Sequence, residues 1–256
     1  MHAIFIQYIC FVHYSKALTL DNEHLNARYK LAKLRAEKRN FNGAMAYVEI
    51  GLTSNPNSIR FLNLKAIIAF VNKSYHLASE TYEQLLALQQ STVKLHENLA
   101  HSYSQTNRFE KAITQYTILI NEYDDKNPSW HFSIAKNFEA LRYLEKAKHH
   151  YEVAILLQDI PLDNSYIALS SVYKKQKDYK AQLETLQKAV AENSKNQRAL
   201  YLLATAADNY FEDKTIVIPY YEKYLAVFGA NASFSEFSRV RIKDLKTELH
   251  MSTEKQ

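Results

Sequence analysis

The chain of 256 residues is 47% hydrophobic and 23% charged, which allows a sizeable buried core and argues against a disordered protein. Its 3 glycines and 4 prolines leave little of the chemistry that β-turns need, whereas 19 tyrosines and 12 phenylalanines supply bulk for packing. The formal net charge of +5 comes without a block of like charge, which excludes a nucleic-acid-binding tail, and a single cysteine, Cys10, excludes an internal disulfide.

Residues 1–24 form the first predicted element. The segment 1–12 is apolar, but it has no basic leader region and no small-residue cleavage site, and it is shorter than the roughly 20 apolar residues of a membrane span. We therefore expect neither a signal peptide nor a membrane span, and a cytoplasmic location. The pattern predicts a helix that is apolar on all sides, the second half of a helix pair whose first helix is missing.

A bulky residue then recurs through the chain at intervals of 34 or 35 residues. It stands at Tyr14, Val48, Tyr82, Tyr116, Tyr151, Leu186 and Tyr220. Small residues recur in the same register, at Ala32, Ala66, Ala100, Ala135, Ser170 and Ala204, and again at Ala44, Ala78, Ala112 and Ala147. Because small side chains let two helices approach closely, the period predicts helix pairs at 25–58, 59–92, 93–126, 128–161, 163–196 and 197–230.

The segment 93–126 is the most regular copy. Its residues Leu99, Ala100, Tyr103, Phe109, Ala112, Tyr116 and Leu119 stand at positions 7, 8, 11, 17, 20, 24 and 27. This pattern resembles the tetratricopeptide repeat (TPR). The resemblance implies an all-α fold, an α-solenoid of stacked antiparallel helix pairs wound as a right-handed superhelix. The copy at 197–230 has Asp213 and Ile216 at packing positions and Pro219 inside its second helix, so we expect it to be irregular.

The array is expected to end in a capping helix at residues 234–250. Gly229 suits the end of the preceding helix. The apolar residues predicted to share one side of the capping helix are Phe237, Val240, Ile242, Leu245 and Leu249. Such a helix presents one apolar face to the array and one polar face to water. Residues 251–256 are expected to be a frayed tail.

Motifs for catalysis or for metal binding are weak. His96, Glu97 and His101 resemble a zinc-binding H-E-x-x-H motif, but the two histidines are five residues apart, so their rings diverge on a helix. The neighbouring His149 and His150 are expected to point apart. The 3 glycines are too scattered for a phosphate-binding loop. We therefore expect no enzyme, no cofactor, no metal site and no small-molecule substrate.

The resemblance implies a binding surface on the concave face, because TPR arrays generally hold a partner segment there with positions 2, 5, 9 and 12 of their first helices. The partner-binding residues predicted from these positions are Tyr29, Lys33, Arg60, Asn63, Ile67, Lys94, Glu97, His101, Phe132, Lys136, Ile167, Lys174, Arg198 and Tyr201. Tyr29, Phe132, Ile167 and Tyr201 are bulky residues that a helix pair does not need for its own core. Apolar anchors beside cations favour a protein or peptide partner that carries apolar residues and carboxylates.

The sequence thus predicts a protein-interaction scaffold or adaptor without catalytic activity. One alternative is an assembly or regulatory subunit whose main contact is the apolar helix in residues 1–20, in a homo- or hetero-oligomer. A less favoured alternative is an RNA-binding helical-repeat protein, because position 5 varies too much among the copies to read one base per repeat.

Overall fold

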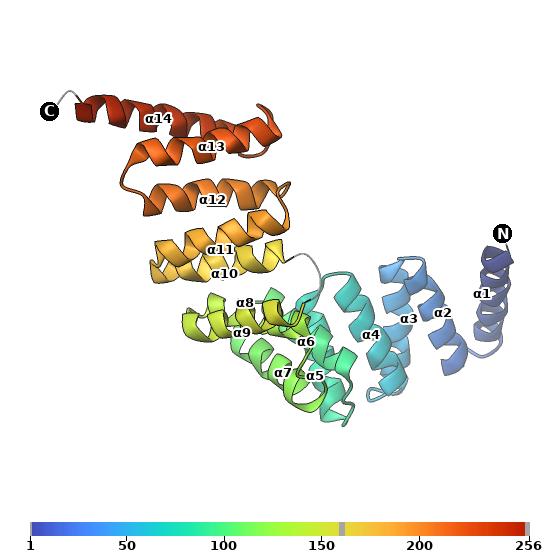
Figure 1. Ribbon diagram of the computed structural model, residues 1–256. Helices are drawn as coiled ribbons and strands as arrows, with labels where there is room; N and C mark the ends of the chain where they lie inside the picture. Colours follow the sequence, from blue (N-terminus) through green and yellow to red (C-terminus); the bar gives the residue numbers. More distant parts are fainter. Residues whose placement is uncertain (1, 159–161, 254–256) are drawn as a thin grey trace. The chain divides into compact units, whose positions relative to one another are not determined.

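The computed structural model describes the backbone of residues 2–158 and 162–253 and the side chains of residues 8–158 and 162–251. These described residues form fourteen α-helices and no strand (Figure 1). The chain divides into two compact units, Met1–Tyr123 and Asp124–Gln256. Each unit is a stack of helices, so the all-α solenoid architecture predicted from the sequence is confirmed.

Unit 1 contains helices α1 to α7. Their bounds are α1 (His2–Leu20), α2 (Leu25–Glu37), α3 (Phe41–Ser54), α4 (Ile59–Val71), α5 (Tyr75–Ala87), α6 (Val93–Gln105) and α7 (Phe109–Glu122). Helices α2 and α3, α4 and α5, and α6 and α7 form antiparallel pairs, and each pair packs against the next. Helix α1 packs against α2 at the end of this stack (Figure 1).

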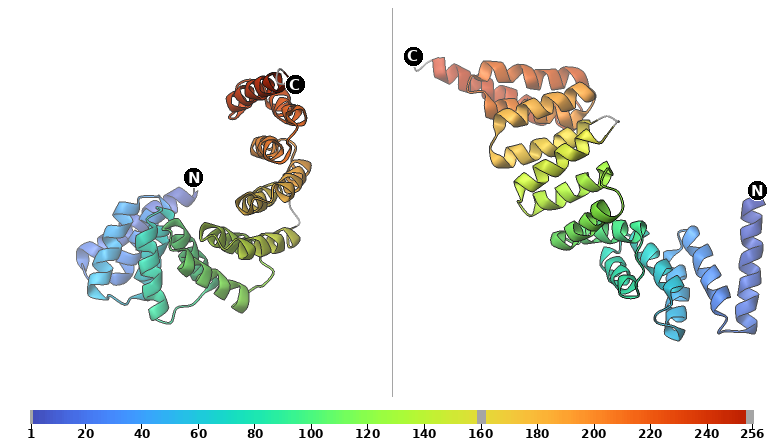
Figure 2. Two further views of the ribbon diagram at one scale, coloured as in Figure 1. Left: turned by 90° about the vertical axis from the view of Figure 1, so that its left-hand side faces the viewer. Right: turned by 60° about the horizontal axis from the view of Figure 1, so that its bottom comes forward.

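Unit 2 contains helices α8 to α14. Their bounds are α8 (Pro128–Ala140), α9 (Leu144–Leu156), α10 (Asp163–Gln176), α11 (Tyr179–Glu192), α12 (Gln197–Tyr210), α13 (Lys214–Phe228) and α14 (Ser235–Thr253). Figure 2 shows the same pairwise stacking in this unit, with α14 lying along α13 at the C-terminal end.

Short polar side chains cap the N-termini of helices in both units. The residues whose side chains accept a hydrogen bond from the first helical turn include Asn40, Thr92, Asn127, Asp178, Asn196 and Asp213. Each satisfies a backbone N–H that has no partner inside its helix. Pro128 occupies the first turn of α8, where a missing N–H costs nothing. Local sequence therefore explains where these helices begin.

The small residues of the sequence period lie where the two helices of a pair touch. Every one of them is fully or almost fully buried, including Ala32 and Ala44 in the α2/α3 pair. Large side chains at the bulky position that recurs every 34 or 35 residues, such as Tyr82 and Leu186, are also buried. Burying a large apolar side chain contributes about 1.5–3 kcal/mol. Because each pair buries only part of its surface by itself, stacking is what completes the core.

The turn inside each regular pair contains one residue with a left-handed backbone. These residues are Arg39, Lys73, Asn107, Arg142 and Lys177, with φ between 58° and 64°. None is glycine, the residue that adopts this conformation without a steric cost. The array therefore accepts a small backbone strain at every regular turn and places long cationic side chains at four of the five positions.

The last helix pair and the capping helix differ in detail from the expected register. In α13, which contains Pro219, Tyr221 and Tyr224 are buried, whereas the predicted Tyr220 is only partly buried. In α14, Leu245 is buried, but Phe237 and Val240 are exposed because Ser235 and Ser238 occupy the inward face. The expectation that all five apolar residues of this helix share the buried side is therefore wrong.

Two predicted boundaries fall partly outside the described residues. Helix α14 continues to Thr253, so the first three residues of the predicted tail are helical, and residues 254–256 lie outside the described part. Residues 159–161, the end of the predicted pair at 128–161, also lie outside it. Among the helices that are described, none is long and apolar enough to span a membrane.

Candidate functional site

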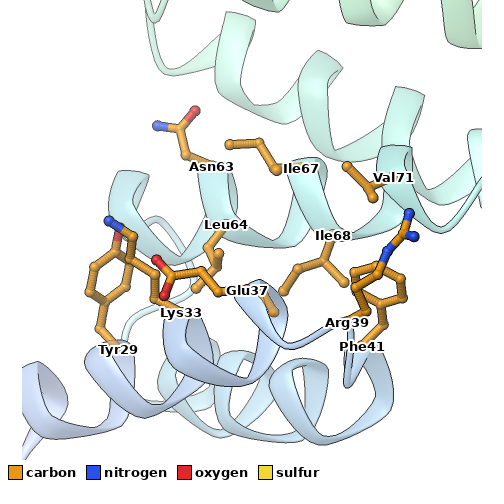
Figure 3. Close-up of a pocket in the computed structure, with 11 residues that line it drawn as sticks. Tyr29, Lys33, Glu37, Arg39, Phe41, Asn63, Leu64, Ile67, Ile68 and Val71 are labelled. Atoms are coloured by element: carbon orange, nitrogen blue, oxygen red, sulfur yellow. The ribbon is translucent and has the colours of Figure 1, made fainter. Parts of the chain in front are cut away.

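A pocket of about 530 Å³ lies between α2 and α4 in unit 1 (Figure 3). The residues that line it are Tyr29, Lys33, Ala36, Glu37, Arg39, Phe41, Asn63, Leu64, Ile67, Ile68 and Val71. Four of them, Tyr29, Lys33, Asn63 and Ile67, belong to the predicted partner-binding set. The volume is in the range of known small-ligand pockets and suits one or two side chains of a partner.

Helical spacing explains how the pocket is built. On α2, Tyr29, Lys33 and Glu37 follow one another at intervals of four residues, and α4 repeats this spacing from Asn63 through Ile67 to Val71. Residues four apart share one face of a helix, so the two helices present two parallel rows of side chains (Figure 3). The buried residues Leu64 and Ile68 form the floor between these rows.

Aromatic and cationic contacts hold one end of the pocket in place. The ring of Tyr29 packs edge-on against Phe61, with ring centroids 5.7 Å apart. The Arg60 guanidinium lies 4.2 Å from the centroid of the Tyr29 ring, and its Nη2 donates to Asn26 Oδ1 at 3.3 Å. Arg60, predicted to contact a partner directly, thus also positions Tyr29. Such cation–π contacts are worth about 0.5–1 kcal/mol at exposed sites.

Charge is distributed unevenly along the pocket. At the end near Tyr29, Lys33 and Glu37 lie one helical turn apart on α2, so a cation and a carboxylate are close together (Figure 3). At the other end, Arg39 lies beside Phe41 and Val71 (Figure 3). No described residue forms an ion pair with Arg39. The pocket therefore has an apolar floor and one end at which Arg39 is the charged lining residue, beside apolar side chains.

The predicted residues on α6 lie outside this pocket. Lys94 Nζ and Glu97 Oε2 form an ion pair at 3.2 Å, and the two residues are one turn apart on the helix. The His101 ring lies 5.5 Å from the rings of both Phe70 and Tyr75. His101 therefore belongs to an aromatic cluster between α4, α5 and α6.

In unit 2, the structure places three of the predicted anchors in packed surroundings. Ile167 is only 4% exposed and belongs to the core around α10, α11 and α12. Phe132 packs edge-on against Tyr151, and Tyr201 stacks on Phe234 with ring centroids 4.4 Å apart. The idea that these side chains are not needed for packing is therefore corrected, because neighbouring helices cover them. The predicted cations Lys136, Lys174 and Arg198 are exposed.

One carboxylate on a first helix of unit 2 is engaged within the protein, which the sequence did not predict. Glu139 on α8 accepts hydrogen bonds from Ser171 and Lys175 on α10, at 2.7 and 2.8 Å, and from Tyr151 at 2.9 Å. Burial alone would raise the pKa of Glu139, but these donors hold that pKa below its ordinary value. Carboxylates with such partners tie neighbouring helices together and are not free to bind a ligand.

The sequence also did not predict a contact between two histidines in unit 2. His131 on α8 and His150 on α9 lie with their Nδ1 atoms 3.0 Å apart, and the His149 ring is 5.3 Å from that of His150. The expectation that His149 and His150 diverge is therefore wrong. The antiparallel turn between α8 and α9 brings together residues 19 positions apart.

Comparison with known proteins adds an independent line of evidence. The family model described as "Tetratricopeptide repeat" matches residues 93–117 and 163–196. No curated protein sequence matches the chain. A solved structure of YrrB, "a TPR protein with an unusual peptide-binding site", is 16% identical, aligns over 73% of this chain and 96% of that chain, and has a TM-score of 0.63.

Two further solved structures are similar. The C-terminal part of a TPR repeat-containing protein from Cytophaga hutchinsonii is 16% identical over 84% of each chain, with a TM-score of 0.70. The MamA protein is 15% identical over 69% of this chain and 94% of that chain, with a TM-score of 0.61. At such low identities the likeness concerns the fold.

Proposed function

Since this chain is a tetratricopeptide repeat protein, we propose that it is a non-catalytic scaffold or adaptor that binds a segment of a partner protein in the pocket between α2 and α4. The observation that carries the proposal is the exposed Ile67, which lies in the middle of the pocket wall above a buried apolar floor. An apolar side chain from a partner would remove this surface from water, at about 25 cal/mol per Å².

The chemistry of the lining supports a peptide with mixed character. Tyr29, Phe41 and Ile67 offer apolar and aromatic surface, whereas Lys33, Asn63 and Arg39 offer hydrogen-bond donors. A partner segment that carries an apolar residue beside a carboxylate matches both properties. The name of the YrrB structure, which mentions a peptide-binding site in that protein, supports the same type of ligand. An RNA ligand finds less support, because the pocket wall is mainly apolar.

A charged substitution in the pocket wall tests the proposal. A random peptide library displayed on phage would be selected on the immobilised full chain, and the selected peptides would be titrated against variants. We expect Ile67→Glu to weaken binding by at least about tenfold, since a carboxylate in the apolar wall must be desolvated when a partner side chain enters. Isothermal titration calorimetry measures the dissociation constants.

Ile50 provides a matched control for this experiment. It is 49% exposed, compared with 50% for Ile67, but it lies on α3 and does not line the pocket. Ile50→Glu should therefore leave peptide binding unchanged, and circular dichroism should show that both variants are folded. Failure to select any peptide, or equal binding by the two variants, would contradict the proposed pocket.

A second candidate function is an assembly contact through α1. Three apolar side chains on this helix, Tyr8, Ile9 and Val12, are 63%, 39% and 46% exposed. Neighbouring exposed apolar residues on one helix are typical of surfaces that another helix covers. The side chains of residues 1–7 lie outside the described part of this helix. In this candidate the protein acts as a subunit of a homo- or hetero-oligomer.

A further inference from the structure

We propose that Arg39 recognises a carboxylate of the bound partner segment and thereby selects acidic partners, an inference that rests on the proposed function of the α2/α4 pocket. Arg39 was not among the residues predicted from the sequence, because it lies in the turn after α2 and not on a first helix. The structure nevertheless includes its side chain in the pocket wall.

The two ends of the pocket differ in charge. Lys33 shares its end with Glu37, one helical turn away, so an incoming carboxylate meets repulsion as well as attraction there. Arg39 lies at the opposite end, where the other lining side chains are apolar (Figure 3). A carboxylate is therefore attracted more strongly to the Arg39 end.

The charge of Arg39 is not used in an ion pair within the described part of the protein. Arg39 is exposed, and no described residue forms an ion pair with it. By contrast, Arg241 and Lys175 form ion pairs with carboxylates of the same unit. A planar guanidinium can donate two parallel hydrogen bonds to one carboxylate, which makes it the side chain of choice for this ligand.

The backbone at Arg39 has an unusual conformation. Arg39 has a φ of 58°, in the left-handed region where a side chain is strained and glycine is not. This strain does not by itself indicate function, because Lys73 in the next turn has a φ of 60° and is absent from the pocket lining. The shared conformation makes Lys73 a matched control, because a glycine at either position removes one cation and also removes the steric strain of a left-handed backbone.

The geometry also gives the bound segment a direction. An apolar side chain would lie against Ile67 and the floor formed by Leu64 and Ile68, and the carboxylate would lie toward Phe41 and Arg39. The expected ligand is therefore a peptide in which an apolar residue and an acidic residue are close in sequence, with the acidic group at the Arg39 end.

The test compares Arg39→Gly with Lys73→Gly in the full chain. The probe is a fluorescein-labelled peptide selected by display on the wild-type chain, together with a copy in which each acidic residue is replaced by its amide. We expect the wild type to prefer the acidic peptide by about tenfold, and Arg39→Gly to lose this preference. Lys73→Gly should retain it, and neither substitution should lower the Tm.

The outcomes separate this inference from the proposed function. A selected peptide that Ile67→Glu fails to bind, but that wild type and Arg39→Gly bind equally in acidic and amide form, would overturn the role of Arg39 and leave the pocket intact. A peptide whose binding is insensitive to Ile67→Glu would overturn the pocket itself. Loss of preference in Lys73→Gly as well would assign the effect to general positive charge, against a specific role for Arg39.

Discussion

His131 and His150 form a hydrogen bond whose direction follows from their surroundings. The Nε2 atom of His131 lies 3.0 Å from the backbone oxygen of Asp125, which can only accept, so this nitrogen carries a hydrogen. The Nδ1 atom of His131 therefore accepts, and His150 Nδ1–H donates to it.

The pH dependence of stability follows from this pair. Burial, together with the neighbouring His131 and His149, lowers the pKa of His150 to about 4 from an ordinary value near 6.5. Between about pH 6.5 and about pH 4 the unfolded chain therefore binds more protons at His150 than the folded chain does, so the stability of the fold decreases as the pH drops. We expect unfolding of unit 2 in urea to show a loss on the order of 1 kcal/mol between about pH 7 and about pH 5.

His150→Gln is the variant that isolates this effect. A glutamine amide can still donate to His131 Nδ1, but it does not titrate. The variant should lose less stability than the wild type over the same pH range. Carboxylates such as Asp208, whose pKa is lowered, titrate below this window and do not interfere. An identical pH dependence in the two proteins would rule out His150 as the titrating group.

At the level of secondary structure, one carboxylate connects the last three helices. Asp208 on α12 accepts two hydrogen bonds from Arg241 on α14, at 2.6 and 3.0 Å, and one from Lys214 on α13, at 3.3 Å. Its side chain is only 14% exposed. Burial alone would raise the pKa of Asp208, but hydrogen bonds from Arg241 and Lys214 lower it. Helix α14 is therefore held by an ionic contact as well as by Leu245.

Removing the charge of Asp208 should loosen the capping helix. We expect Asp208→Asn to cost about 2–4 kcal/mol in the free energy of unfolding, because the half-buried Arg241 guanidinium would lose one of its two carboxylate partners and Lys214 would lose its ion pair. Hydrogen–deuterium exchange should speed up first in α14. The exposed pair of Glu236 and Arg239 on the same helix provides the control, and Glu236→Gln should cost less than about 0.5 kcal/mol.

A result in which both substitutions had the same small effect would show that Asp208 does not hold α14 in place.

The contribution of Asp208 to stability has its own pH range. Because its folded pKa lies below the unfolded value near 3.8, this stabilisation is present at neutral pH and is lost as the pH falls through the folded pKa.

At the level of the whole molecule, each unit has its own buried core, and α1 lies at the outer end of unit 1. The candidate in which α1 is an assembly contact predicts self-association or partner binding through its exposed apolar residues. In the homomeric form, sedimentation velocity should show a mass that rises with concentration, and Val12→Glu should abolish this rise.

Val227 is a suitable control, because it is 47% exposed compared with 46% for Val12 and lies on α13 in the other unit. Val227→Glu should leave the association unchanged. A wild-type chain that stays monomeric over the whole concentration range would remove the homomeric form of this candidate. The proposed peptide pocket is independent of the outcome, since residues of α1 do not line it.

The candidate site was only partly predictable from the sequence. Positions on α2 and α4 led to Tyr29, Lys33, Asn63 and Ile67, because residues four apart on a helix share a face whatever their neighbours are. Arg39 was missed because it lies in a turn, and its side chain reaches the pocket only through the packing of α2 against α4.

The sequence by itself determined the helix pairs, their period and the small residues at their contacts, since these depend on spacing along the chain and on side-chain volume. The tertiary structure decided which of the predicted partner-binding positions remain open. Ile67 and Ile167 both lie at such positions on first helices, yet Ile67 is 50% exposed and Ile167 is 4% exposed. The physical reason is that burial depends on the side chains that neighbouring helices bring to each position, and spacing along the chain does not specify them.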